Sequence, residues 1–285
     1  MPILTRALDE LGVPWSEVAW DDEAGSADDW ARFPLVVVRS TWDYHRRLDE
    51  FLHWVDRVDA RTVMANPPPI LRWNVDKHYL RDLQAAGLPC VPTCFAEPGP
   101  DDDWREELRV LLEKGPVVVK PAISAGSNDT ERHDAFAGAR AHVSSLLALG
   151  RSTMIQPYVR RVDVDDETGL VFLGGRFSHA FAKGALLTDT KDVAGGLFAR
   201  ERIEPRIADG SQLDIGRRAM GWLTSRFGDV LYARIDLLPG DSGPMIVEAE
   251  LTEPSLFLGT DPSAAANAAR AIADALNESS GGRSR

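Results

Sequence analysis

Two apolar runs near the C-terminus, each carrying carboxylates, constrain this chain most. The first is Tyr-Ala-Arg-Ile-Asp-Leu-Leu at 232–238, and the second is Met-Ile-Val-Glu-Ala-Glu at 245–250. Residues two apart on a strand point to the same side, so Glu248 and Glu250 share a face. A hairpin over the intervening prolines and glycines would bring Asp236 beside them. The pattern predicts an oxygen-only site for Mg²⁺, with Mn²⁺ as the alternative ion, although a solvated charged strand face has the same spacing.

Length and charge narrow the class of protein. The chain has 285 residues, 44% of them hydrophobic and 27% charged, which is typical of a globular enzyme with two or three lobes. The net charge of −12 argues against nucleic acid and anionic membranes as partners. No apolar run approaches the ~18 residues of a membrane span, and the first residues lack the apolar core of a signal peptide. Cys90 and Cys94 are the only cysteines, which favours free thiols in a reducing cytoplasm.

Helical and strand patterns alternate along the chain, which predicts an α/β (α+β) fold. We expect helices over residues 4–11, 48–58, 74–86, 104–114, 135–149, 212–227 and 262–276. We expect extended segments, besides the two carboxylate runs, over residues 16–20, 35–38, 91–95, 117–121, 153–159, 169–173 and 176–183. A glycine-bearing loop at 184–196 follows the last of these. The first expected helix starts almost at Met1, so we expect the strand that normally precedes such a helix to be missing or to lie upstream of this start.

Proline content marks the main boundary. Residues 66–69 are Asn-Pro-Pro-Pro, a stiff break between lobes. We therefore expect an N-terminal substrate-side lobe over 1–66, a central lid lobe over 67–157 and a C-terminal lobe with the metal site over 158–277. The polar residues 278–285 are expected to form a frayed tail.

Two lysines are candidates for phosphate binding. Lys120 ends a Val-Val-Val strand and precedes a loop of small residues at 122–130. A lysine on a rigid strand is a good point charge for a phosphate, and Gly126 allows backbone N–H groups to approach anionic oxygens. The loop lacks the Gly-Lys-Ser/Thr ending of a Walker A motif, and an ordinary strand-end lysine beside a turn is the alternative. Lys77 lies at an expected helix start, which favours anions, although a surface helix lysine has the same pattern.

The strand expected at 153–159 is a candidate for binding a planar base. Pro157 cannot donate a backbone hydrogen bond, so the edge of this strand is interrupted and can offer its other polar groups to adenine. Asp163, Asp166 and Glu167 follow and could accept hydrogen bonds from ribose hydroxyls. An inter-lobe linker with a solvated acidic turn explains the same residues.

Further polar groups lie at strand ends. Lys183 ends the strand at 176–183, and Arg234 shares a strand face with Asp236. Arginine is preferred for forked contacts with phosphate or carboxylate, whereas a salt bridge to its acidic neighbours is the alternative. The polar cluster at 39–44 follows the strand at 35–38, and ligands bind at the carboxyl ends of strands in open α/β sheets.

The order of these signals is more informative than any one of them. A helix-start lysine, a strand lysine with a small-residue loop, a hinge strand, an Arg-x-Asp strand and a Glu-x-Glu strand succeed one another between residues 66 and 258. This order resembles the ATP-grasp superfamily, which implies three lobes with the nucleotide held between two of them. The segments 39–44, 73–80, 177–180 and 248–256 look like the group that contains the cycloserine-forming O-ureido-serine cyclo-ligase.

The resemblance implies a role for individual residues. The ATP-binding residues would be Lys77, Lys120, Ser124, Gly126, Ser127, Gln156, Tyr158, Val159, Asp166 and Glu167. The metal ligands would be Asp236, Glu248 and Glu250, and the catalytic residues Arg234 and Lys183. The substrate residues would be Arg39, Ser40, Thr41, Asp43, Tyr44, Glu253 and Ser255.

The expected activity follows from the chemistry of a carboxylate, which is a poor electrophile until ATP converts it to an acyl phosphate that a nitrogen can attack. The partner would be a small carboxylate or amino acid, and a homodimer is an open possibility because many relatives dimerise. The nitrogen could belong to the same molecule, as in cyclisation of an O-ureido-serine-like amino acid. An intermolecular amino-acid or peptide amide ligase and a non-catalytic nucleotide-binding module are the alternatives.

Overall fold

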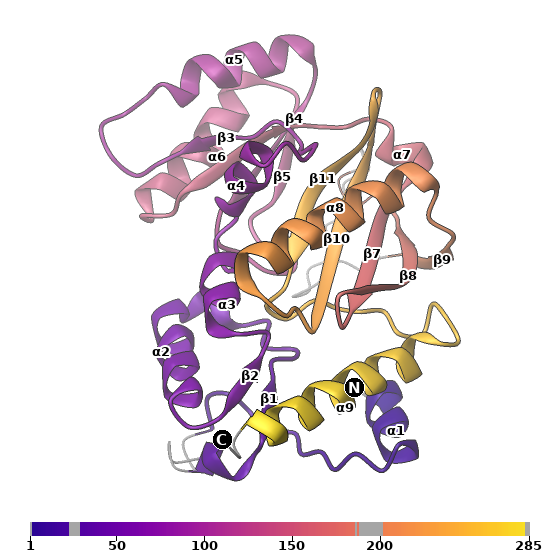
Figure 1. Cartoon of the computed structure of the whole chain (residues 1–285). Helices are drawn as coiled ribbons and strands as arrows, with labels where there is room; N and C mark the ends of the chain where they lie inside the picture. The colour runs from indigo at the N-terminus through magenta and orange to yellow at the C-terminus, as the bar shows by residue number, and fades with distance from the viewer. Residues whose placement is uncertain (1, 23–28, 186, 188–201, 283–285) are drawn as a thin grey trace.

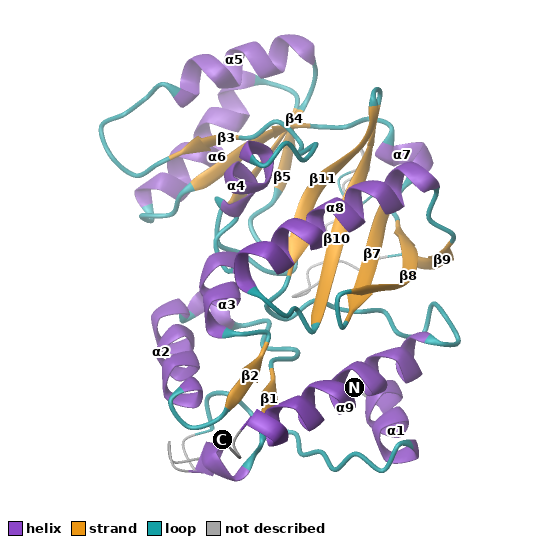
Figure 2. Ribbon diagram, in the orientation of Figure 1, coloured by secondary structure: helices purple, strands orange, loops and turns teal. Residues whose placement is uncertain are grey.

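Three β-sheets and the helices around them make up the computed structural model, which describes residues 2–22, 29–185, 187 and 202–282 (Figures 1 and 2). Two parallel strands, β1 (Leu35–Val37) and β2 (Val63–Ala65), form the first sheet. The second has the order β3-β6-β4-β5, with strands Cys94–Ala96, Thr153–Pro157, Val117–Pro121 and Glu131–His133. The third has the order β11-β10-β7-β8-β9, with strands Gly243–Glu250, Tyr232–Gly240, Glu167–Leu173, Arg176–Lys183 and Ile203–Arg206. The predicted α/β (α+β) class is confirmed.

The helices connect and cover these sheets. The longer ones are α1 (Pro2–Glu10), α2 (Leu48–Asp59), α5 (Trp104–Lys114), α6 (Phe136–Ala148), α8 (Gly210–Phe227) and α9 (Ala264–Gly282). The shorter ones are α3 (Pro68–Asn74), α4 (Tyr79–Ala85), α7 (Val162–Asp165) and the 3₁₀ turns η1 (Asp29–Arg32) and η2 (Tyr44–Arg46). The helix α9 continues to Gly282 where a frayed tail was expected from 278. Most of the loop expected at 184–196 lies outside the described residues.

The N-terminal segment differs from expectation in two respects. Residues 16–20 are all described and form no strand. The sheet made by β1 and β2 does not include them. Trp20 instead packs its ring edge-on against Phe51, at a centroid distance of 5.6 Å, and joins an aromatic core with Trp54. The strand β2 was not predicted, since its three residues are too few for a periodic pattern.

The proline-rich break begins a helix instead of an open linker. Pro68 and Pro69 occupy the first turn of α3, where a missing N–H costs nothing. The helix expected at 74–86 is confirmed only from Tyr79 to Ala85, as α4, because α3 ends at Asn74 and a turn that contains Lys77 separates the two helices. Buried residues of this segment, including Ile70 and Leu83, share a core with the five-stranded sheet.

The four-stranded sheet has α5 and α6 on one face (Figure 2). Val117, Val119 and Ile155 are fully buried there against Leu108 and Val143 of these helices. The strand β5 at the edge of this sheet was not predicted.

The five-stranded sheet has two different faces. The helix α8 packs on one face through Ala219 and Leu223, in the core that contains Ile235 of β10. The helices α1 and α9 pack against each other (Figure 1). They share a separate core with Phe181 of β8. The predicted hairpin of β7 and β8 turns through Gly174 and Gly175, whose positive φ angles of 54° and 71° suit a two-residue hairpin loop.

Candidate ATP and metal site

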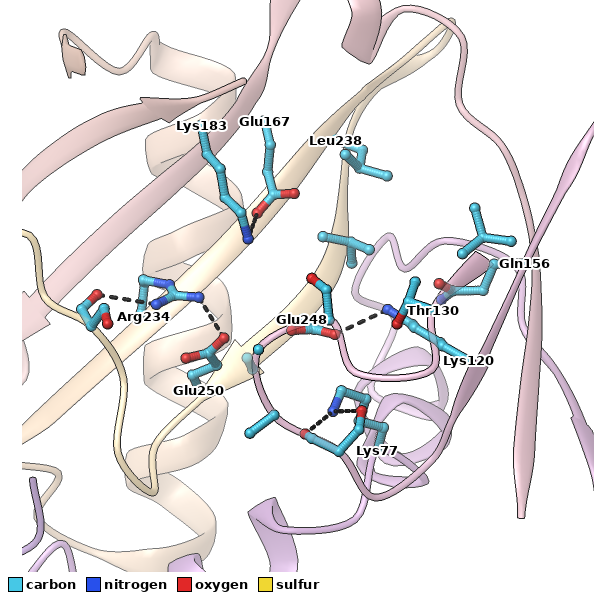
Figure 3. A pocket seen from close by; sticks show the side chains of 18 of the residues that line it. Lys77, Lys120, Thr130, Gln156, Glu167, Lys183, Arg234, Leu238, Glu248 and Glu250 are labelled. Carbon is cyan, nitrogen blue, oxygen red and sulfur yellow. Dashed lines mark hydrogen bonds and ion pairs between the residues drawn. The ribbon is translucent and has the colours of Figure 1, made fainter. Parts of the chain in front are cut away.

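A cavity of about 480 Å³ is lined by residues of the four-stranded sheet, the five-stranded sheet and the N-terminal segment. Figure 3 shows the charged side chains that converge in it from opposite walls. Lys77 and Lys120 come from one side, and Arg234, Glu248 and Glu250 come from the strands β10 and β11 on the other.

The carboxylate hairpin has the predicted register. Asp236 pairs with Glu248 across β10 and β11, and Arg234 pairs with Glu250. Ile235, between Arg234 and Asp236, is buried under α8, so alternation turns the charged residues to the opposite face. One oxygen from each of Asp236, Glu248 and Glu250 lies within 4.8 Å of the others. This all-oxygen set fits a hard divalent ion such as Mg²⁺.

Cationic side chains compensate these carboxylates within the chain. Arg234 makes a forked contact with Asp236, in which Nε donates to Oδ1 at 2.8 Å and Nη2 to Oδ2 at 2.7 Å. Its Nη2 also donates to Glu250. Lys120 Nζ donates to Glu248 Oε1 at 3.0 Å. Arg234 therefore forms the salt bridge that was the alternative interpretation, and it does so with two of the three candidate metal ligands.

The pKa values show how strongly the cavity differs from water. Burial raises the pKa of Glu250 to about 8, with Arg234 acting in the opposite direction. Burial likewise raises the pKa of Glu253 to about 7 and that of Glu167 to about 7. For Glu248 burial also disfavours the charge, but Lys120 and other lysines outweigh it and hold the pKa below its ordinary value. Three of these four carboxyls would thus be stabilised by an additional cation.

The loop at 122–130 forms the wall around Lys77. Lys77 Nζ donates to the Ser124 carbonyl at 2.9 Å, and its backbone N–H donates to the Ala122 carbonyl at 3.0 Å. Ser124, Gly126 and Ser127 all line the cavity. Lys77 therefore sits in the turn between α3 and α4 and not at a helix start, and its anchor is the loop.

The expected base-binding segment also lines the cavity, through Gln156, Tyr158 and Val159. The strand β6 pairs with β3 only as far as Ile155, and beyond it the Gln156 amide donates to Thr93 at 2.8 Å. The Tyr158 N–H donates to the Pro116 carbonyl at 2.8 Å, whereas the Val159 N–H has no backbone partner among the described residues. An open strand edge is thus present at the end of β6, and the rest of the strand is paired on both sides.

The acidic turn after this segment divides into two parts. Glu167 lines the cavity opposite Lys183, whose Nζ lies 3.6 Å from Glu167 Oε1. Asp166 is not part of the cavity wall that the described residues form. Its carboxylate accepts a hydrogen bond from Arg202 at 2.7 Å. Asp163 accepts from the Tyr158 hydroxyl at 2.5 Å.

The N-terminal segment contributes unequally. Tyr44 lines the cavity, as do Glu253 and Ser255 after β11. Arg39 reaches the same segment after β11, where Nη2 donates to the Pro254 carbonyl at 2.9 Å. Its remaining guanidinium nitrogens, Nε and Nη1, and the Thr41 hydroxyl are buried without a hydrogen-bond partner in the part of the chain described.

Asp43 and Ser40 do not join the cavity. Asp43 accepts from Arg47 at 2.7 Å and from Trp20 at 3.1 Å, so its carboxylate is used within the N-terminal segment. Ser40 is exposed and has a φ angle of 53°. The structure therefore brings together most of the predicted nucleotide, metal and catalytic residues. Among the described residues, the cavity wall does not include Asp166, Asp43, Ser40, Arg39 or Thr41. Asp236 is also outside the wall and accepts hydrogen bonds from Arg234, which is in it.

One important residue was missed. Asn74 lines the cavity and fixes the end of β11: its Nδ2 donates to the Ala249 carbonyl at 2.6 Å, and its Oδ1 accepts from the Leu251 N–H at 2.6 Å. It therefore holds the backbone on both sides of Glu250. Its position in the Trp-Asn-Val-Asp-Lys segment was a signal, but nothing local showed which strand it would meet.

Comparison with solved structures defines the class. The D-alanine–D-alanine ligase from Bacillus anthracis complexed with ATP superposes with a TM-score of 0.53 at 15% identity, over 72% of this chain and 66% of that one. The ATP-grasp ligase PsnB, complexed with minimal precursor, Mg and ADP, superposes with a TM-score of 0.62 at 17% identity, over 98% and 93%. These likenesses show that the fold is that of the ATP-grasp ligases, as predicted.

The family follows from nearer relatives. The cycloserine biosynthesis protein DcsG of Streptomyces lavendulae is 37% identical over 284 residues, which cover 97% of this chain and 93% of that protein. The crystal structure of D-cycloserine synthetase DcsG superposes with a TM-score of 0.85 at 35% identity, over 97% and 94% of the two chains. The family model of the DcsG N-terminal domain matches residues 1–66. This chain belongs to the DcsG family, so the predicted resemblance is confirmed.

Among the described residues, no helix has both the length and the apolar character needed to cross a membrane.

Proposed function

We propose that this chain is an ATP- and Mg²⁺-dependent ligase that activates a substrate carboxylate as an acyl phosphate, forms ADP, and releases phosphate when a nitrogen attacks. The observation that carries the proposal is the convergence of Glu248 and Glu250 with Lys77 and Lys120 in one cavity, with the Asp236 carboxylate within 4.8 Å of the two glutamates. The 37% identity with DcsG supports intramolecular cyclisation of an O-ureido-serine-like amino acid as the reaction, and hence a place in cycloserine biosynthesis.

The chain's cations and carboxylates suit the two halves of MgATP. Asp236, Glu248 and Glu250 would hold Mg²⁺, which supplies charge neutralisation of the phosphate oxygens when bound. Lys120 pairs with Glu248 at 3.0 Å in this structure. Mg²⁺ bound to Glu248 would replace this ion pair and leave the Lys120 ammonium group able to contact a phosphate. Lys77 stands beside the loop at 122–130, whose backbone N–H groups can add further contacts.

The remaining nucleotide contacts would come from the end of β6 and the segment that follows it. The open edge at Gln156, Tyr158 and Val159 would take the adenine, because a planar base needs one donor and one acceptor along a strand. Glu167 would accept from a ribose hydroxyl. Asp166 is a weaker candidate for this role, since it is already paired with Arg202.

Arg234 and Lys183 would act where negative charge develops. Arg234 is almost fully buried and reaches both the metal cluster and the Ser255 carbonyl, at 3.0 Å from Nη1. Preorganised donors in a site from which the closed lid excludes water stabilise a developing oxyanion more than they would in water. Arg234 would therefore stabilise the acyl phosphate and the tetrahedral state that follows nitrogen attack.

The substrate would enter between the N-terminal segment and the turn after β11. The unpartnered guanidinium nitrogens of Arg39 and the Thr41 hydroxyl are donors of the kind that bind a substrate carboxylate. Tyr44, Glu253 and Ser255 would complete the pocket. In this scheme residues 1–66 serve the substrate, 67–157 close over the nucleotide and exclude water, and 158–277 hold the metal.

The test is Mg²⁺-dependent ADP release with O-ureido-serine and other amino acids supplied singly and in pairs, with the mass of each product recorded. A single substrate that is turned over to a cyclic product supports the proposal. A requirement for two substrates would replace it by the intermolecular ligase, and ATP binding without turnover on any acid would leave a nucleotide-binding module.

Site variants test the residue roles separately. Glu250→Gln and Lys120→Ala should each lower ADP release by at least about a hundredfold, because each removes a charge that contacts the phosphates or their metal. Lys114→Ala is the matched control, since Lys114 is an exposed lysine at the end of α5. Full activity of both site variants, with circular dichroism unchanged, would refute the assignment.

A further inference from the structure

A second cluster of metal-ligating side chains lies on the lid lobe, away from the cavity. It consists of Glu131 and His133 on β5 and His142 on α6, and one ligand atom of each lies within 4.8 Å of the others. None of the three belongs to the wall of the cavity that the described residues form. The roles proposed for ATP, Mg²⁺ and substrate therefore leave this cluster without a function.

Strand register explains why the three side chains converge. Glu131 pairs with Val119 and His133 with Val117, so both lie on the sheet face that is buried against α6. Arg132 between them points to the other face, where its guanidinium lies 4.2 Å from the centre of the Tyr158 ring.

The helix α6 is shaped to receive the ring of His133. Gly138 lies one turn before His142, and a Cβ at this position would come within 3.3 Å of His133 Nδ1. The glycine thus leaves room for one imidazole, and His142 presents the other. Both rings are largely buried, with side-chain exposures of 13% and 10%, whereas Glu131 is 63% exposed and keeps one side open to water.

The distances lie within a few tenths of an ångström of those on one face of a coordination tetrahedron. His133 Nε2 lies 3.1 Å from His142 Nδ1, and Glu131 Oε2 lies 3.6 Å and 3.9 Å from the same two atoms. Nitrogen and oxygen ligands at 2.0–2.2 Å from a tetrahedral ion are separated from one another by roughly 3.3–3.5 Å. A hydrogen bond between two neutral imidazoles accounts for the 3.1 Å contact. It does not account for a carboxylate that approaches both nitrogens while bonding to neither.

We propose that Glu131, His133 and His142 form a binding site for a divalent transition-metal ion, with Zn²⁺ as the best match and water as the fourth ligand. Two imidazoles and one carboxylate suit Zn²⁺, whereas Mg²⁺ prefers oxygen ligands throughout.

The ion would cross-link β5 to α6 within the lid lobe. The strand β5 is a three-residue edge strand with β4 as its neighbour in the sheet, so few backbone hydrogen bonds hold it. A bond from β5 to α6 would fix its position. Thr130, directly before β5, lines the nucleotide cavity, and Arg132 within β5 contacts Tyr158 in the cavity wall. The bound ion would therefore also restrict the motion of that side of the cavity.

The experiment uses the full chain, stripped of metals with a chelator and held in excess Mg²⁺ to occupy the carboxylate hairpin. Zn²⁺ is titrated against a chromophoric competitor, and Co²⁺ is added separately to record the visible absorption of a four-coordinate ion. We expect one high-affinity ion per chain and a higher melting temperature with Zn²⁺ present.

Three variants locate the ion. His133→Gln and His142→Gln should each weaken Zn²⁺ binding by more than about tenfold, since even loss of a residue that only supports a ligand costs that much. Glu131→Gln is a third variant whose exposed side chain puts folding at little risk, and it should weaken binding as well. His53→Gln is the matched control, because His53 is exposed on α2. Absence of Zn²⁺ binding in the parent chain, or an affinity equal to the parent's in all three variants, would overturn the proposal.

Discussion

Replacing Asn74 by alanine tests whether one side chain positions the metal-binding end of β11. Asn74 is the last residue of α3 and is buried against this strand, where it contacts three backbone groups: the Ala249 carbonyl at 2.6 Å, the Leu251 N–H at 2.6 Å and the Thr252 N–H at 3.1 Å. Glu250 lies between the first two. The variant removes all three contacts and leaves the sequence of the strand unchanged.

The size of the effect follows from these contacts. A buried backbone group without a partner costs about 1–3 kcal/mol. Water entering from the adjoining cavity can satisfy part of the deficit, so we expect the free energy of unfolding to fall by roughly 3–5 kcal/mol. A displacement of the Glu250 carboxylate by about 1 Å would lower ADP release by about a hundredfold.

The assay is urea unfolding followed by tryptophan fluorescence, together with steady-state ADP release at saturating Mg²⁺. Asn277→Ala is the matched control, because Asn277 is exposed on α9 and its replacement should change stability by no more than about 0.5 kcal/mol. If Asn74→Ala unfolds within about 1 kcal/mol of the parent chain, the asparagine does not hold the strand, and the reasoning fails.

Other predictions follow from single contacts. A Cβ on Gly169 would lie 2.2 Å from the Phe181 ring, so Gly169→Ala should destabilise the chain by about 1–3 kcal/mol in the same unfolding assay, and an unchanged midpoint would contradict the packing. Burial raises the pKa of Cys90 to about 11 and of Cys94 to about 12, so both thiols should react with a disulfide reagent at pH 8 many times more slowly in the folded chain than in urea, and equal rates would count against their burial. Burial lowers the pKa of His179 below 6.5, so the unfolded chain binds its proton more readily, and this group contributes a loss of stability as the pH falls below about 6.5. Comparing unfolding at pH 7.5 and 5.5, His179→Gln should lose less stability on acidification than the parent, and parallel losses would refute this assignment.

The sequence predicted the elements whose pattern is local. The strand β4, the helix α5 and the hairpin of β7 and β8 lie where periodicity and glycines placed them, because side-chain alternation and turn geometry depend on near neighbours. Short elements such as β2 and β5 escaped prediction, since three residues form no recognisable period and exist only by pairing with another strand. Residues 16–20 failed as a strand for the complementary reason, since no partner strand was available to them.

The candidate site divides in the same way. Residues two apart on one strand must share a face, so the cluster of Glu248 and Glu250 was determined by the sequence itself, and a short hairpin was enough to add Asp236. Only the tertiary structure decided that Asn74 meets Leu251, 177 residues away, and that the carboxylate of Asp43 accepts from Trp20, 23 residues away, instead of facing the cavity. Such contacts depend on how whole elements pack. The order of the motifs along this chain therefore determined that it is an ATP-grasp protein, whereas the packing of its lobes decided which of the predicted residues reach one another.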